Sequence, residues 1–200
     1  MTAGGAPLRV FVALTVSQQA ILAMESVIQH MTERIKEGVR WVNPEGIHVT
    51  LKFLGNVDPS RLPGIAQAMD RTGEALPPFR IGLSGLGVFP NLERPRVLWT
   101  GVKGDLEQLE LLYRSLEEAL VLQGYSREGR AFNPHLTLGR VRDGLANQQR
   151  RWIGDIVPTV TLPQVEPWRA EAIHLIQSHL SPAGATYSKL HSTSLGGMES

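Results

Sequence analysis

The sequence predicts an α+β fold built from two similar lobes. The first observation is the order of the elements, β-α-β-α-β-β-α-β-α-β-β, which mixes strands and helices without a Gly-rich nucleotide-binding loop. The second is that each half of the chain carries one strand with a His-x-Thr motif, at 48–50 and at 135–137. Nothing beyond the motif aligns between the halves, so we interpret them as similar lobes rather than as a tandem repeat.

Strands are predicted where β-branched and aromatic residues run between turn-forming residues. These segments are 9–16, 47–54, 79–90, 96–102, 135–141, 168–180 and 187–195. Turn-prone residues join the third and fourth of them, which favours a hairpin. We treat residues 1–200 as one bilobal domain, with short disordered ends near 1–7 and 196–200.

Helices are predicted where apolar residues recur every three or four positions. Ser17 is the candidate N-cap of the first helix, which closes near Gly38, and Asp105 that of a Leu-rich helix ending at Gly124. A short helix is expected near 144–156. The segment 58–73 also begins like a helix, but it carries a proline and a glycine, so only its later part is expected to be regular.

Composition narrows the function classes. The chain has 200 residues, 42% of them hydrophobic, with 20 Lys and Arg against 19 Asp and Glu. That balance argues against a broad surface for duplex nucleic acid and leaves room only for a local basic pocket. There are no cysteines, which excludes disulfides, thiolate zinc sites and a Cys nucleophile. No stretch reaches membrane length, so we expect a soluble, cytoplasmic protein without a membrane partner.

Each motif places an imidazole and a hydroxyl on one face of a strand, because side chains alternate between faces. By this count the first motif exposes His48, Thr50 and Lys52, and turns Val49, Leu51 and Phe53 to the core. The second exposes His135, Thr137 and Gly139, with Leu136 and Leu138 behind them. The histidine and threonine of each motif are therefore expected to lie on a strand whose other face packs rigidly against the apolar core.

Two other interpretations compete with catalysis. A single strand histidine is usually a structural residue, although a matched pair with threonines is less easily explained in that way. A zinc site is the other alternative, but it generally adds His, Cys or carboxylate ligands at a recognisable spacing, and none accompanies these two. We therefore predict no metal and no cofactor. A third His-x-Thr, at 191–193, lacks the following leucine and is taken as accidental.

Two histidines and two hydroxyls suit metal-free phosphoryl transfer. A neutral imidazole can accept a proton from an attacking hydroxyl or water, and a protonated one can donate a proton to the leaving oxygen. Threonine hydroxyls can donate hydrogen bonds to the non-bridging oxygens of a phosphodiester. An already strained group, such as a cyclic phosphate, fits this set. The spacing does not show which imidazole acts first.

Four segments, "RVFVALTV", "WVNPEGIHVTLKFLG", "HLTLGR" and "LIQSHLSPAGATYSKLHSTSL", together resemble the 2H phosphoesterase superfamily. More narrowly, they look like the RNA 2′,3′-cyclic phosphodiesterases, also called 2′-5′ RNA ligases. The resemblance implies a pseudo-twofold arrangement around a central cleft, with His48 as proton donor and His135 as proton acceptor. It also implies that Thr50 and Thr137 bind phosphate. The implied activity opens cyclic phosphate ends of RNA to 2′-phosphates, with 2′-5′ joining of RNA ends as a related reaction.

Weaker candidates surround the motifs. Lys52 shares the motif face by alternation and would contact phosphate or simply be solvated. Arg140 matches an arginine common in the family, but alternation turns it away from His135 unless a bulge intervenes. Phe11 is a candidate for stacking on a base or an ordinary core residue. Arg130 and Phe132 are candidates for the mouth of the cleft.

The expected partners are RNA ends or nucleotides that carry a 2′,3′-cyclic phosphate, and the expected oligomeric state is a monomer. Two alternatives stay open at this point. One is hydrolysis of another nucleotide-derived cyclic phosphate, because the loops around the cleft would set that choice. The other is an RNA-end binding protein with little catalysis.

Overall fold

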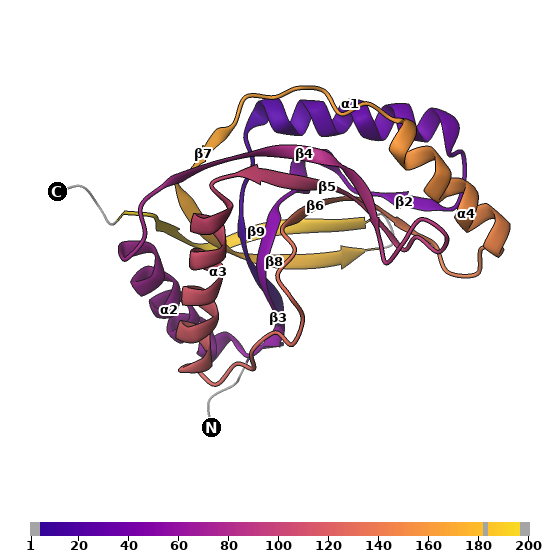
Figure 1. Ribbon diagram of the computed structural model, residues 1–200. Helices are drawn as coiled ribbons and strands as arrows, with labels where there is room; N and C mark the ends of the chain where they lie inside the picture. The colour runs from indigo at the N-terminus through magenta and orange to yellow at the C-terminus, as the bar shows by residue number, and fades with distance from the viewer. Residues whose placement is uncertain (1–4, 182–183, 197–200) are drawn as a thin grey trace.

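The computed structural model describes residues 5–181 and 184–196, and it contains two antiparallel sheets with helices outside them (Figure 1). The helices are α1 (Gln18–Arg34), α2 (Leu62–Glu74), α3 (Leu106–Val121) and α4 (Asn147–Ile156). The strands are β1 (Leu8–Leu14), β2 (Val39–Trp41), β3 (Val49–Val57), β4 (Phe79–Phe89), β5 (Val97–Gly104), β6 (His135–Val141), β7 (Trp168–Ala170), β8 (Ala172–Ser181) and β9 (Gly184–Ser194). The predicted α+β class is confirmed.

Each sheet contains one motif strand. The first sheet has the order β3-β1-β8-β9, and the second has the order β2-β6-β5-β4-β7. The first motif lies at the start of β3 and the second at the start of β6. The helices α2 and α3 pack side by side, and α2 covers the face of β8 and β9, whereas α1 and α4 lie at the opposite side of the molecule (Figure 1). The helices thus leave the motif faces of the sheets uncovered.

Three elements differ from the sequence predictions. The helix α2 begins at Leu62 and so includes Pro63 and Gly64, because a proline in the first turn of a helix loses no hydrogen bond. The segment 168–180 is not one strand: β7 belongs to the second sheet and β8 to the first. The short strand β2 was not predicted. The expected disordered ends fall mostly outside the described residues, and Gly5 to Pro7 have no regular structure.

A β-bulge follows the threonine of each motif and corrects the simple alternation of side chains. Between β3 and β1, Thr50 lies opposite Ala13 and Lys52 opposite Val12, so Leu51 has no partner. Between β6 and β5, Thr137 lies opposite Trp99 and Gly139 opposite Leu98, so the intervening Leu138 has none. Each extra residue reverses the faces of the residues that directly follow it in the strand.

The bulges exchange the predicted faces of four residues. Phe53 lies opposite Phe11, on the face of Thr50, and its side chain is 49% exposed instead of turned to the core. Lys52 moves to the buried face. In the second sheet Gly139 moves to the buried face, and Arg140, opposite Val97, joins the face of Thr137.

Candidate active site

His48 is held just before β3 by its own main chain. Its Nδ1 donates a hydrogen bond to the carbonyl oxygen of Gly46 at 2.7 Å. A carbonyl oxygen only accepts, so the proton is on Nδ1 and the neutral ring keeps its lone pair on Nε2. The ring therefore has one fixed orientation and one nitrogen available for proton transfer.

His135 has the same arrangement at the start of β6. Its Nδ1 donates to the carbonyl oxygen of Asn133 at 2.8 Å, again two residues earlier in the chain. Pro134 stands between them, and its fixed φ favours the extended backbone that brings this carbonyl back to the ring. The two imidazoles are thus prepared for proton transfer through Nε2 by equivalent contacts in two different sheets.

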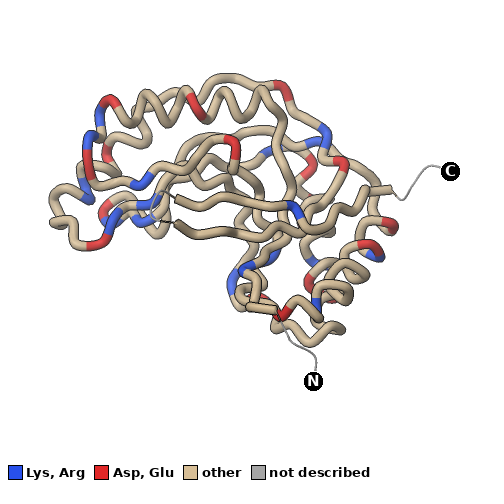
Figure 2. The backbone as a smooth tube through the Cα atoms, turned by 180° about the vertical axis from the view of Figure 1, so that it is seen from behind, with Lys and Arg blue, Asp and Glu red and all other residues tan. Residues whose placement is uncertain are grey.

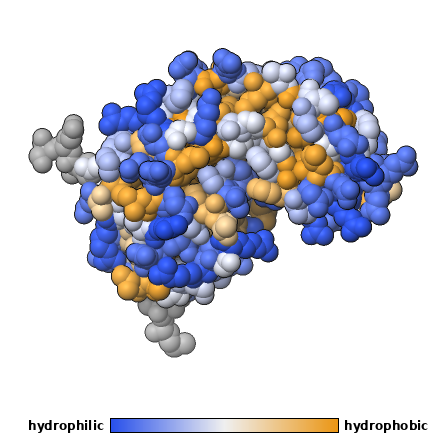
Figure 3. Space-filling view, in the orientation of Figure 1, coloured by the Kyte–Doolittle hydropathy of each residue, from blue (hydrophilic) through white to orange (hydrophobic). Residues whose placement is uncertain are grey.

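The two motifs lie close to one another. The strands β3 and β6 are in contact although they belong to different sheets. Burial lowers the pKa of His48, the hydrogen bond to Gly46 raises it, and the charge of His135 lowers it further. The contact between the two motif strands therefore brings the two imidazoles within electrostatic range of one another. The space-filling view shows a hollow near the middle of the molecule, with hydrophobic residues on its floor (Figure 3).

Aromatic rings surround both imidazoles. Phe11 stacks on His48 with ring centroids 4.5 Å apart, and Tyr187 of β9 meets His48 edge-on at 5.4 Å. On the other side Phe89 meets His135 edge-on at 5.0 Å. Phe11 is only 2% exposed, so it supports the His48 ring and offers little surface to a base. Tyr187 was not predicted, because it comes from a strand far along the sequence.

Lys52 contacts neither solvent nor the motif face. Its Nζ lies 2.6 Å from Oε1 of Glu117 on α3 and donates to the carbonyl oxygen of Ser126 at 2.7 Å. The other oxygen of Glu117 accepts from the backbone N–H of Glu128 at 2.8 Å. The side chains of Lys52 and Glu117 are 8% and 6% exposed. The pair ties the first motif strand to the segment that leads into the second.

Arg140 lies on the face of Thr137, near Tyr187 of the first sheet. Burial raises the pKa of Tyr187, and the positive charges of Arg140 and Arg9 lower it, so both guanidinium groups lie near this phenol. Arg9 also stacks over the ring of Phe53 at 4.7 Å from its centroid. These two arginines come from different sheets, and they place positive charge beside the aromatic wall of His48.

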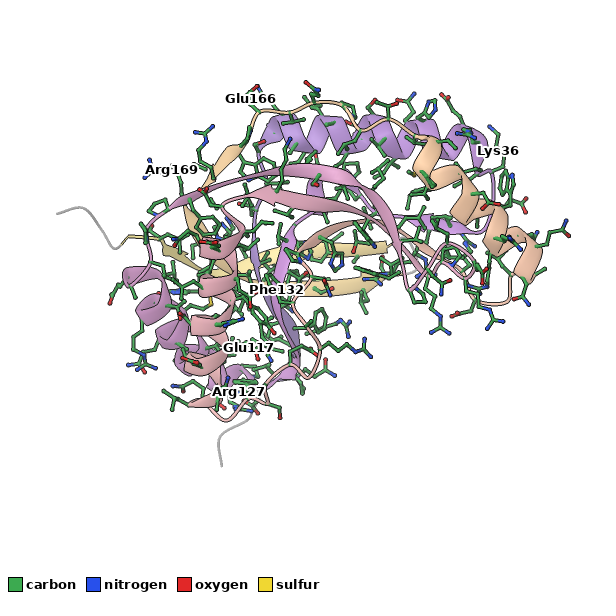
Figure 4. The ribbon with its side chains drawn as sticks, viewed as in Figure 1. Lys36, Glu117, Arg127, Phe132, Glu166 and Arg169 are labelled. Carbon is green, nitrogen blue, oxygen red and sulfur yellow. The ribbon has the colours of Figure 1, made fainter. Side chains whose placement is uncertain are left out.

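Two further candidates belong to the segment that precedes β6. Phe132 stacks on Tyr113 of α3 with ring centroids 4.2 Å apart, on the α3 side of the segment before β6 (Figure 4). Arg130 is exposed in the same segment. Phe132 therefore anchors this segment to α3.

The remaining histidines of the last two strands have their own partners. His191 and Thr193, the third His-x-Thr, both bond to Oδ1 of Asp70 on α2, at 2.7 and 2.6 Å. They fasten a helix to the outer face of the first sheet. His174 is buried between Thr15 and Ser192, and burial together with the charge of Lys189 lowers its pKa to about 4.

Within residues 5–181 and 184–196, no three His, Asp or Glu side chains lie together in a way that could hold a metal ion. Over the same part of the chain, no helix is both long and apolar enough to cross a membrane.

Comparison with known proteins settles the family. The chain matches the family described as LigT like phosphoesterase over residues 19–99 and 102–187, and each of these segments contains one His-x-Thr motif. The chain belongs to the LigT-like phosphoesterase family. It is therefore a phosphoesterase, as the sequence resemblance implied.

Relatives in the LigT-like family span most of the chain. A protein of Methanothermobacter thermautotrophicus is 35% identical over 82% of this chain and 87% of its own length. One of Archaeoglobus fulgidus is 33% identical over 92% of this chain and 98% of its own. Both are named RNA 2′,3′-cyclic phosphodiesterase.

Solved structures of the family share the fold. The protein TT0787 of Thermus thermophilus is 28% identical, with a TM-score of 0.68 over 95% of this chain and 99% of that protein. E. coli LigT in its apo form is 22% identical, with a TM-score of 0.70 over 96% and 99% of the two chains. The latter identity supports the fold alone.

Proposed function

We propose that this protein hydrolyses 2′,3′-cyclic phosphate ends of RNA to 2′-phosphomonoesters, with His48 and His135 as a metal-independent acid–base pair. The observation that carries this proposal is the matched tethering of the two rings. Each Nδ1 is held by a main-chain carbonyl, each Nε2 is left for proton transfer, and the two motif strands are in contact with one another. The names of the relatives in Methanothermobacter and Archaeoglobus support the choice of substrate.

In the proposed reaction, Nε2 of His135 accepts a proton from a water molecule, whose oxygen attacks the phosphorus. The bond between phosphorus and the 3′ oxygen breaks, and Nε2 of His48 donates its proton to that oxygen. The hydroxyls of Thr50 and Thr137 donate to the non-bridging oxygens and hold the group in line. With a 5′ ribose hydroxyl in place of water, His135 accepts the proton of that hydroxyl and His48 again protonates the leaving 3′ oxygen, so the same residues serve 2′-5′ joining.

The lowered pKa of His48 shapes this mechanism. In the free protein burial favours the neutral ring, whereas a proton donor must be charged. A bound phosphodiester brings a negative charge beside the ring, and an opposite charge raises the pKa of an imidazole. Substrate binding therefore charges the proposed donor. Arg140, on the face of Thr137, adds a fixed positive charge to the same face of the second sheet.

The test is product analysis on a short RNA that ends in a 2′,3′-cyclic phosphate, in buffer with EDTA. We expect a 2′-phosphate as the sole product and the same rate with and without EDTA. A protein prepared in parallel with His135→Ala controls for contaminating ribonucleases. Loss of activity in EDTA that zinc or magnesium restores would contradict the metal-independent mechanism, and a 3′-phosphate product would contradict the assigned leaving group.

A further inference from the structure

Two arginines face each other beside the second motif. Arg40 of β2 and Arg140 of β6 are direct partners in the antiparallel ladder. Directly opposed side chains lie on the same face of a sheet, and the bulge at Leu138 puts Arg140 on the face of Thr137. Arg40 therefore extends the motif face toward the edge of the second sheet, because β2 is the edge strand there.

The juxtaposition of these two arginines costs free energy unless an anion binds between them. Like charges directly opposite in an antiparallel pair destabilise the sheet. Both side chains are exposed, and in the described part of the chain no carboxylate lies within 4.0 Å of either guanidinium group. A bound anion would remove the repulsion. Lys and Arg segments gather at this end of the molecule, with acidic ones among them (Figure 2).

The spacing between the pair and the motif indicates which anion fits. Thr137 lies opposite Trp99 and Arg140 opposite Val97, two residues apart on β5. At about 3.4 Å per residue, the arginine pair begins roughly 7 Å from the threonine along the sheet. This distance is comparable to the spacing between successive phosphates of an RNA strand. A ligand with one phosphate at Thr137 would thus present the next at the arginines.

We propose that Arg40, together with Arg140, binds the phosphodiester that joins the terminal nucleotide of the RNA to its 5′ neighbour. This inference rests on the proposed function, and it makes an oligonucleotide end the preferred substrate over a cyclic mononucleotide. Guanidinium groups suit this contact, because their planar donors match two phosphate oxygens. Near-neutral overall charge is compatible with a short site of this kind, since two arginines are enough for one phosphate.

The experiment compares three substrates with the wild-type protein and with Arg40→Gln. They are 2′,3′-cyclic AMP, the dinucleotide ApA ending in a cyclic phosphate, and the same dinucleotide with a neutral methylphosphonate linkage. We expect Arg40→Gln to lower the ratio of kcat/KM for the charged dinucleotide to that for cyclic AMP by about tenfold. The methylphosphonate is expected to cost the wild type a similar factor and the variant little, because the contact is already gone.

Arg169→Gln is the matched control. It removes the same charge from β7, at the opposite edge of the second sheet, and it is expected to leave all three values of kcat/KM unchanged. An unaltered substrate ratio in Arg40→Gln, or an equal loss on the charged and neutral dinucleotides, would overturn the subsite while wild-type turnover upheld the proposed function. A wild type inactive on every substrate would overturn both.

Discussion

Replacing either His48 or His135 with alanine is expected to lower kcat/KM on a 2′,3′-cyclic phosphate by roughly 10²- to 10⁴-fold, the usual contribution of one general acid or base. Each variant removes one of the two groups that must exchange protons with the reacting oxygens. Because they act as a pair, the double variant is expected to lose little more than the worse of the two single variants. Steady-state kinetics on 2′,3′-cyclic AMP measures kcat/KM for the two single variants and the double variant.

His191→Ala is the control for this series. It removes a histidine from the third His-x-Thr, whose ring bonds to Asp70 on the outer face of the first sheet. We expect its activity to stay within about twofold of the wild type, since no proton transfer passes through it. A large loss in His191→Ala with normal activity in His48→Ala would show that the wrong motif has been assigned. Thermal unfolding of each variant separates loss of chemistry from loss of fold.

Lys52→Met is expected to destabilise the protein by about 3–5 kcal/mol, because it leaves the buried carboxylate of Glu117 without its partner. The double variant Lys52→Met with Glu117→Leu removes both charges from the same buried space. It is expected to recover most of the lost free energy of unfolding, since apolar residues of similar volume often replace a buried ion pair without loss. Urea unfolding at neutral pH measures each free energy.

The four proteins of this cycle, wild type, two single variants and the double, give the coupling energy between Lys52 and Glu117. Arg114→Met with Glu110→Leu is a matched comparison, since that ion pair also uses a glutamate of α3 but is exposed. The coupling energy between Arg114 and Glu110 is expected to be less than about 1 kcal/mol. A loss below about 1 kcal/mol in Lys52→Met would contradict the buried position of the pair.

The sequence was sufficient for most of the elements and for both motifs, because these depend on local patterns. Apolar periodicity located α1, α3 and α4, and the paired His-x-Thr motifs located the two strand starts. What alternation alone could not predict was the bulge after each threonine. A bulge depends on how β3 meets β1 and β6 meets β5, and it decided the faces of Lys52, Phe53 and Arg140.

Residues contributed by distant strands were also beyond the sequence. Tyr187 reaches His48 only because β9 closes the first sheet, and Arg40 reaches Arg140 only because β2 pairs with β6. Neither residue carries a local sequence signal that places it near a motif histidine.

The repeated Asn-Pro before each motif, at 43–44 and 133–134, is a local signal that the sequence does contain. At 133–134 it directly precedes the histidine and supplies the carbonyl that orients His135.

The shared space of the two imidazoles is tested most directly by NMR titration of the His48 ring in the wild type and in His135→Asn. A positive charge nearby disfavours protonation, so removing His135 should raise the pKa of His48. His191→Asn, which removes a histidine from the outer face, should leave that pKa where it is. We predict a clear upward shift in His135→Asn alone. The same pKa of His48 in all three proteins would contradict the convergence of the two motifs on one phosphate.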